Sequence, residues 1–201
     1  MISIATYSLI YDKINSNKCY VKSEEDSICP LCSSPELKVI GSRNRGALRG
    51  DGEAIILVIR RLRCRNCRRI HHELPDMLVP YKRYTSAAIE AILDDNATEI
   101  CCENSSISLI KSWFAEASEY IAGCLPAIAA RLGLETKLRS GSARQRIKDL
   151  VGEASGWLAK AVRTIVNTNT VLHLCPKSPV IHFMLKPEKG GLQHERSQKG
   201  R

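Results

Sequence analysis

Two pairs of cysteines are the residues whose spacing most strongly predicts chemistry in this sequence. Cys29 and Cys32 form CPLC, and Cys64 and Cys67 form CRNC, so both pairs have the C-x2-C spacing. Each C-x2-C can fold into a tight turn that points two thiolates at one ion, and two such turns complete a closed tetrahedral site. We therefore predict a structural zinc ion bound by all four cysteines.

The segment between the two pairs predicts the strands that must position them. ELKVIGSRNR and EAIILVIRRLRC are rich in Val, Ile and Leu, and they flank the Gly-rich stretch GALRGDGE. RRIHHEL, after the second pair, is a candidate third strand. Together these features predict a small β zinc ribbon, in which the metal supplies folding energy that the small core lacks.

Three other interpretations of these residues are weighed against a four-cysteine site. A thioredoxin-like redox pair needs one C-x-x-C within alternating strands and helices, and neither pair has that setting. His71 and His72 follow Cys67 at spacings that could replace one thiolate, or they lie at a strand end on the ribbon surface. HHE contains the H-x-E of zinc deaminases, but no P-C-x-x-C follows it. The role of the two histidines stays open at this point.

The charge of the chain is unevenly distributed. Residues 29–84 carry twelve Lys and Arg against five Asp and Glu, residues 85–135 two against eight, and residues 136–201 thirteen against four. Nine arginines and no lysine lie between 43 and 69. Arginine forks onto phosphates and guanine edges, so this bias predicts nucleic acid, chiefly double-stranded DNA, rather than a merely solvated basic strand. The predicted contacts on the ribbon are Arg43, Arg45, Arg60, Arg61, Arg63, Arg65, Arg68 and Arg69.

After LPDMLVPYKRY the apolar spacing becomes helical. Residues 86–93 predict a short helix with Thr85 or Ser86 as its N-cap, and SISLIKSWFAEASEYI predicts a second helix after a polar turn. Two such helices resemble a helix-turn-helix, although a plain helical bundle explains the spacing as well. As a recognition helix, the second would present Ser105, Ser106, Ser108, Lys111 and Ser112 to DNA.

The predicted fold class is α+β, a small β zinc ribbon followed by a mostly α-helical region with a helix-turn-helix-like unit. Pro126 is expected to kink or break the second helix and Gly133 to end it, and residues 143–166 predict one further long helix. The predicted organisation is an N-terminal segment 1–27, a ribbon 28–84, a helix-turn-helix-like region 85–135, a C-terminal helix and extension 136–185, and a disordered basic tail 186–201.

The sequence argues against several classes of protein. It shows no export signal and no run of about 18 apolar residues, so we expect a cytoplasmic protein without a membrane partner. A transposase would gather carboxylates on a sheet around two magnesium ions, whereas Asp94, Asp95, Asp149 and Glu153 fall in predicted helices. We expect no catalysis and no small-molecule substrate. The alternatives to DNA binding are docking to a protein or RNA, a homodimer, or a transposase fragment.

CPLC, the arginine-rich hairpin, HHELPDMLVPYKRY and SISLIKSWF resemble a largely uncharacterised bacterial family of zinc-ribbon proteins associated with transposons. The similarity covers about residues 28–115, and GWLAKAVRTIVN is a weaker match. The resemblance implies a ribbon like the zinc-binding head of insertion-sequence transposases, a helix-turn-helix after it, Cys29, Cys32, Cys64 and Cys67 as ligands, and DNA binding in a mobile-element setting. Arg68 departs from the glycine that such turns commonly carry.

Overall fold

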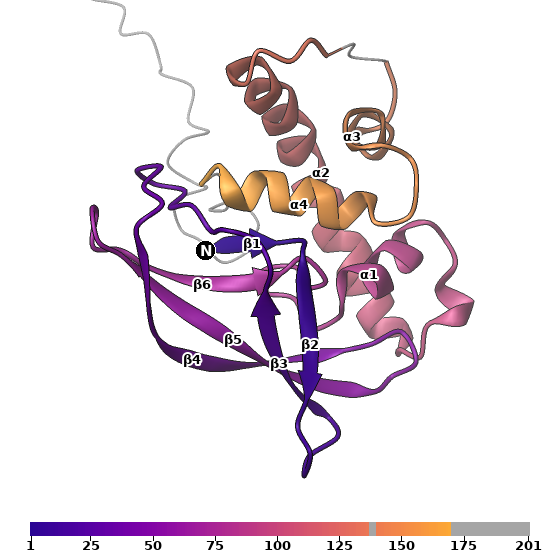
Figure 1. Cartoon of the computed structure of the whole chain (residues 1–201). Coiled ribbons are helices and arrows are strands. Elements are labelled where there is room, and N and C mark those ends of the chain that lie inside the picture. The colour runs from indigo at the N-terminus through magenta and orange to yellow at the C-terminus, as the bar shows by residue number, and fades with distance from the viewer. Residues whose placement is uncertain (137–139, 170–201) are drawn as a thin grey trace, which may run out of the picture.

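The computed structural model describes residues 1–136 and 140–169, which form one mixed β-sheet and four α-helices (Figure 1). This is an α+β arrangement, as predicted. The strands are β1 (Ile2–Ile4), β2 (Tyr7–Tyr11), β3 (Lys18–Ser23), β4 (Leu37–Leu48), β5 (Ala54–Cys64) and β6 (Ile70–Pro75). The helices are α1 (Ser86–Leu93), the 3-10 helix η1 (Ala97–Glu99), α2 (Asn104–Arg131), α3 (Ala143–Val151) and α4 (Trp157–Asn167).

The sheet is organised around β5, whose Val- and Ile-rich sequence favours a buried strand. β4 pairs antiparallel with β5 along one edge, with a bulge between Val39 and Gly41. The other edge of β5 pairs first with β3 in parallel and then with β6 in the antiparallel sense. The predicted hairpin and third strand are therefore confirmed as β4, β5 and β6.

Residues 1–27 contribute three strands to the same sheet. β1 pairs in parallel with β6, Ile2 opposite Glu73, and β2 pairs with β3, which joins β5. Ile2, Ile4, Cys19 and Val21 consequently share one buried cluster with residues of β5. This pairing crosses the predicted boundary between residues 27 and 28, and the domain boundaries themselves stay predictions.

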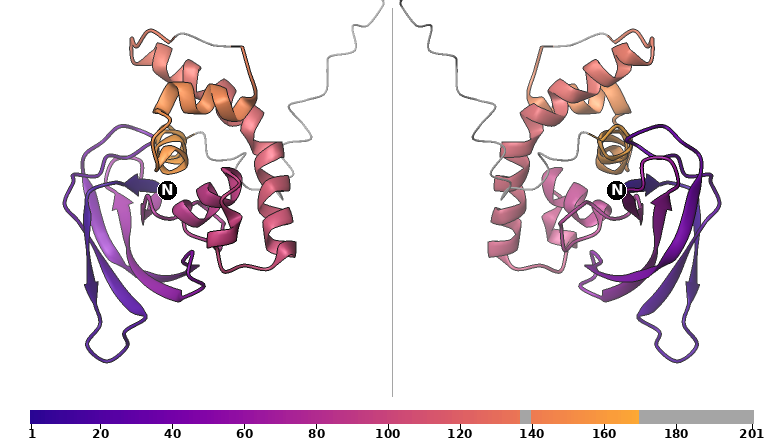
Figure 2. Two further views of the ribbon diagram at one scale, coloured as in Figure 1. Left: turned by 90° about the vertical axis from the view of Figure 1, so that its right-hand side faces the viewer. Right: turned by 90° about the vertical axis from the view of Figure 1, so that its left-hand side faces the viewer.

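The helices form a second layer against the sheet (Figure 2). α1 and α4 lie next to the sheet, and α2 lies on their far side. Asn167 on α4 fastens the layers, since its Oδ1 accepts from Ser3 N at 2.8 Å and its Nδ2 donates to Ser3 O at 2.9 Å. The Asn167 side-chain amide thus bonds to the backbone of Ser3 as the backbone of a neighbouring strand would.

The helical layer has its own core, built around edge-to-face contacts of Phe114 with Trp113 and Trp157. A buried carboxylate supports this core, because Glu90 on α1 accepts from Gly156 N at 2.6 Å and Leu158 N at 2.9 Å. These bonds satisfy amides at the start of α4, whose N-cap residue makes no side-chain cap bond of its own. Glu90 therefore caps a helix other than its own.

The helix ends agree with the predictions in part. Thr85 caps α1, as predicted, and Gly133, with φ +71°, follows the last residues of α2. α2 continues through Pro126 and changes direction along its length (Figure 2). The single long helix predicted for 143–166 is wrong: α3 ends at Gly152 and α4 starts after Gly156, and both glycines have positive φ.

The predicted tail 186–201, and the extension 170–185 before it, lie outside the described residues. Within residues 1–136 and 140–169, no helix is both long enough and apolar enough to cross a membrane.

Candidate metal centre and basic surface

The fold brings the four predicted cysteines together. Cys29 and Cys32 lie between β3 and β4, and Cys64 and Cys67 lie at the β5–β6 turn; their sulfur atoms are all within 4.8 Å of one another. The Sγ atoms of Cys29 and Cys67, and those of Cys32 and Cys64, are 3.6 Å apart. Metal–sulfur bonds of about 2.3 Å in a tetrahedron require sulfur atoms about 3.8 Å apart. The thiols are unbridged and placed to hold a metal ion.

The two cysteine turns have the same backbone conformation. Cys29 N donates to Ser34 O at 3.0 Å, and Cys64 N donates to Arg69 O at 2.9 Å, in both cases five residues along the chain. The residue after each second cysteine is left-handed, with φ +56° at Ser33 and +59° at Arg68. Arg68 therefore adopts the conformation that glycine would favour at this position, and the turn keeps its geometry without a glycine.

Backbone amides and burial act in opposite directions on the first cysteine of each turn. The N–H groups of Cys67 and Asn66 point at Cys64 and lower the pKa of its thiol to about 6. Burial raises the pKa of Cys29 to about 12, in spite of hydrogen bonds from the Leu31 and Cys32 amides. A buried thiolate at Cys29 therefore requires a cation beside it.

His71 is the nearest other donor to this cluster. Its ring is buried, and its Nε2 lies 3.3 Å from the sulfur of Cys29 rather than in the set formed by the four thiols. Burial lowers the pKa of His71, which favours the neutral form of the ring. His72, its neighbour, points to the other face of β6, where it meets Arg43 and Arg61.

A buried ion pair holds the first cysteine turn against the sheet. Glu73 on β6 is 1% exposed and accepts from Arg60 Nε at 2.6 Å and from an Arg60 terminal nitrogen at 2.7 Å. Ser27, two residues before Cys29, donates to the same carboxylate at 2.7 Å. Arg60, predicted to contact DNA, is thus paired with a buried carboxylate, while 37% of its side chain stays exposed. This network is the part of the site that sequence reasoning missed.

The other predicted arginines occupy different positions. Arg45 is half-buried and donates to Lys82 O at 2.8 Å, so it holds the loop before α1. The remaining six are exposed or half-exposed, and no carboxylate among residues 1–136 and 140–169 forms an ion pair with them. These six are Arg43, Arg61, Arg63, Arg65, Arg68 and Arg69.

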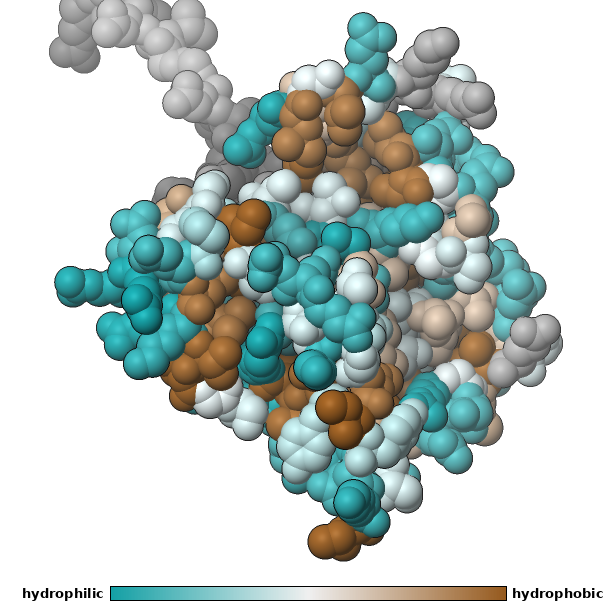
Figure 3. Space-filling model, viewed as in Figure 1, coloured by the Kyte–Doolittle hydropathy of each residue, from teal (hydrophilic) through white to brown (hydrophobic). Residues whose placement is uncertain are grey.

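The register of the sheet places Lys38, Arg61 and Arg63 on one face, and Arg65, Arg68 and Arg69 lie in the turn between β5 and β6. Arg63 lies opposite Lys38 on β4 and Ile70 on β6, and Arg61 lies opposite His72, two residues along. Side chains directly opposite each other project from the same face of a sheet. We call Lys38 and the six arginines the basic surface. Hydrophilic side chains project from this end of the sheet in Figure 3.

Several cations of the helical region have acidic partners, in contrast to the basic surface. Lys148 lies 2.6 Å from Asp94, Arg146 lies 2.5 Å from Glu119, and Lys111 lies 2.8 Å from Asp95. Asp94 also accepts from Trp157 Nε1 at 3.0 Å. Asp149 and Glu153 both accept from Gln145. The carboxylates considered for catalysis are thus placed on or beside helices.

The residues predicted to form a recognition helix lie in the first turns of α2. Ser105, Ser108 and Ser112 are exposed there, Ser106 is half-buried, and Lys111 is exposed and paired with Asp95. The connection from α1 to α2 runs from residue 94 to residue 103, longer than the turn of three to four residues typical of a helix-turn-helix.

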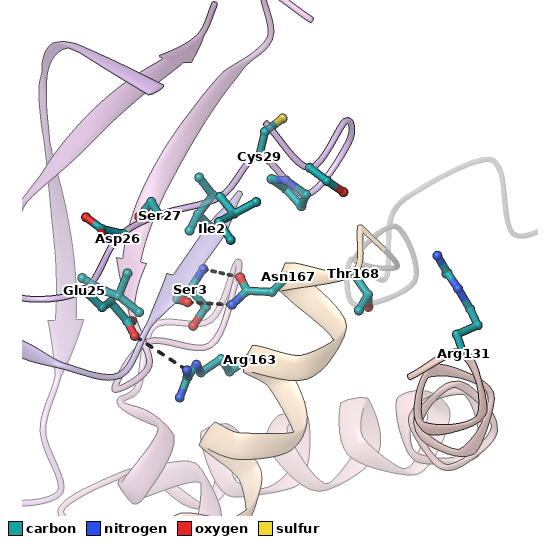
Figure 4. A pocket seen from close by; sticks show the side chains of 14 residues that line it. Ile2, Ser3, Glu25, Asp26, Ser27, Cys29, Arg131, Arg163, Asn167 and Thr168 are labelled. Carbon is teal, nitrogen blue, oxygen red and sulfur yellow. Dashed lines mark hydrogen bonds and ion pairs between the residues drawn. The ribbon is translucent and has the colours of Figure 1, made fainter. Parts of the chain in front are cut away.

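A cleft of about 400 Å³ lies beside the first cysteine turn, between the sheet and the ends of α2 and α4 (Figure 4). Ser27 and Cys29 line one side, and Arg131, Arg163 and Thr168 line the other. Arg163 makes an ion pair with Glu25 at 3.7 Å, while Arg131 lies well apart from it (Figure 4). The two arginines do not converge on one point, so the cleft offers no compact anion site.

Residues 29–113 match the model of a family described as a domain of unknown function, DUF6431. The matched stretch begins at the first cysteine of the cluster, contains the other three, and ends at Trp113 in α2. No curated protein and no solved structure matches the chain.

Proposed function

We propose that this chain is a zinc-stabilised DNA-binding protein whose basic surface grips the phosphates of a duplex, without catalysing a reaction. In keeping with the family resemblance, the proposal extends to a role with mobile DNA. The exposed serines at the start of α2 would add secondary contacts.

The observation that carries the proposal is the different use of cations in the two layers. In the helical layer, Lys111, Arg146 and Lys148 are paired with carboxylates. On the sheet, six arginines lie along β4, β5 and the second cysteine turn with no acidic partner among the described residues. Like charges held close together repel, so a rigid surface of this kind gains most from a polyanion.

Zinc is the metal that suits this centre best. Four thiolates at tetrahedral spacing are the donor set of structural zinc sites, and the closed set leaves no position for substrate. The expected result is one zinc ion per chain by elemental analysis, and a tetrahedral tetrathiolate spectrum after replacement by cobalt. A chain that folds fully and contains no metal would contradict the proposal.

Binding is tested by titrating a labelled duplex at several salt concentrations. The wild-type chain should bind with an affinity that falls steeply with salt, and Arg61→Gln/Arg63→Gln should reduce the slope of log K against log salt by about 0.9 for each phosphate that the variant no longer neutralises. Lys160→Gln makes the same kind of charge change on the exposed surface of α4 and should leave the slope unchanged. Tighter binding of structured RNA than of duplex DNA, or no salt dependence, would refute the proposal.

A further inference from the structure

The turn between β2 and β3 extends beyond the rest of the sheet (Figures 1 and 2). Its side chain at Ile14 is 98% exposed, more than Leu109 on α2 at 72%. Figure 3 shows hydrophobic surface at this extremity of the molecule. A fully exposed aliphatic side chain at a projecting tip is placed to enter another molecule.

The turn is rigid, because its own polar groups bond one another. Asp12 accepts through Oδ1 from Ile14 N at 2.9 Å and from Asn15 N at 3.1 Å. Asp12 N donates to Lys18 O at 2.8 Å, and Lys18 N donates to Asn15 O at 3.0 Å. The backbone at Ile14 is thus held in place before binding, which reduces the entropy cost of binding.

The surroundings of the tip are basic. Lys13, Lys18 and Lys22 all lie on the hairpin, while the carboxylate of Asp12, its acidic residue, is occupied by backbone amides. Behind the tip, Ile10 and its cross-strand neighbour Tyr20 are exposed as well. The hairpin therefore combines a fully exposed isoleucine at its tip and further exposed apolar side chains behind it with lysines in its turn and on β3.

We propose that this hairpin is a wedge for double-stranded DNA, in which Ile14 enters between two base pairs from the minor groove and kinks the duplex. The inference rests on the proposed DNA binding. One aliphatic side chain is the size of a base step, and apolar side chains inserted in this way are typical of proteins that bend DNA. A stable protein–protein contact would need roughly 1,000 Å² of interface, far more than one isoleucine offers.

Bending is measured by energy transfer between dyes at the two ends of a short duplex, with the full-length, metal-loaded chain. Wild-type protein should shorten the end-to-end distance, and Ile14→Ala should abolish the shortening. We expect the affinity of Ile14→Ala for an intact duplex to fall by about fivefold. The salt dependence should not change, because isoleucine contacts no phosphate.

A duplex with one mismatched step should bind wild-type protein more tightly than an intact duplex, since its step is already weakened, and Ile14→Ala should lose this preference.

Leu109→Ala is the matched control, because it also shortens an exposed aliphatic side chain and should leave bending intact. A duplex that stays straight with wild-type protein, or that Ile14→Ala bends equally well, overturns the wedge. Self-association in sedimentation that Ile14→Ala removes also overturns it, in favour of contact between copies. Absence of duplex binding by every variant would instead be a failure of the proposed function. The DNA in those complexes that Arg61→Gln/Arg63→Gln still forms should be bent.

Discussion

The metal end of the sheet and the helical layer use charge in opposite ways. Asp94 joins α1 to α3 and α4 through Lys148 and the indole of Trp157, so its charge stabilises contacts between helices. On the sheet, by contrast, Arg61 and Arg63 project beside His72 and Lys38, without a carboxylate partner among the described residues. The first arrangement lowers the energy of the folded chain, and the second raises it by repulsion.

This difference in charge gives the proposed metal a second role at this end of the sheet. Arginines that repel one another favour unfolding of the strands that carry them, and the hydrophobic cluster of the sheet is smaller than that of the helices. Zinc held by the four thiolates would tie the two cysteine turns together and would carry a net negative charge at their centre. The same ion would therefore both stiffen the basic surface and partly neutralise it.

Loss of the metal should have the largest effect, and it should fall on the sheet rather than on the helices. Cys64→Ser, or a strong chelator, removes a contribution on the order of 10 kcal/mol from the sheet. In hydrogen exchange, amides of β4, β5 and β6 should lose protection, while those around Trp157 should lose much less. Ser23→Ala, outside the metal centre, is the control. Equal loss of protection in both layers would show that the helices depend on the metal as well.

Removing the carboxylate behind the first cysteine turn should have the next largest effect. Glu73→Gln weakens the bonds to Arg60 and Ser27, which hold Cys29 in place. Residues that orient metal ligands typically contribute 10- to 100-fold in affinity, so we expect zinc affinity to fall by about tenfold in competition with a chelator. The exposed Glu53→Gln should change nothing. A variant of Glu73 with unchanged zinc affinity would mean that the ion pair stabilises the sheet only.

Local signals explain what the sequence predicted well. The C-x2-C turns, the hairpin between them and the cap at Thr85 depend on residues close together in the chain, and all three are present. The break in the helix at 152–156 is not predicted, because the apolar stripe continues at helical spacing on both sides of it. Gly152 and Gly156 are the local signal for this break.

Long-range pairing explains what could not be predicted. The parallel pairing of β1 with β6 places Ile2 opposite Glu73, and no local sequence pattern predicts this pairing. Strand alternation could have shown that Arg60 and Arg61 face opposite sides of β5, and so that one of them points away from any shared surface. Whether the inward arginine meets an acid depends on where β6 lies, which only the fold reveals.

A substitution in the helical layer should alter stability without altering DNA binding. Glu90→Gln keeps one acceptor for the amides of Gly156 and Leu158 but brings an NH2 group against the other, at a cost of about 2 kcal/mol. Thermal unfolding should report this destabilisation, and duplex affinity below the unfolding temperature should stay the same. Glu116→Gln, exposed on α2, is the control. A fall in affinity with Glu90→Gln would mean that the packing of α1 against α4 also shapes the DNA-binding surface.

The smallest predicted effect is that of a substitution at Arg68, which should change stability and DNA binding in opposite directions. Arg68 has φ +59°, which is unfavourable for any side chain with a Cβ, so Arg68→Gly should stabilise the metal-loaded sheet by about 0.5 kcal/mol after the larger chain entropy of glycine is counted. The same change removes one cation, so duplex affinity should fall while thermal stability rises. Ser33→Gly is its counterpart in the other cysteine turn, where φ is +56° and the charge does not change; it should stabilise equally and leave affinity unchanged. If Arg68→Gly and Ser33→Gly both bound DNA as tightly as the wild-type chain, Arg68 would make no contact with phosphate. The positive charge of Arg68 would then repel its neighbours without being neutralised by DNA.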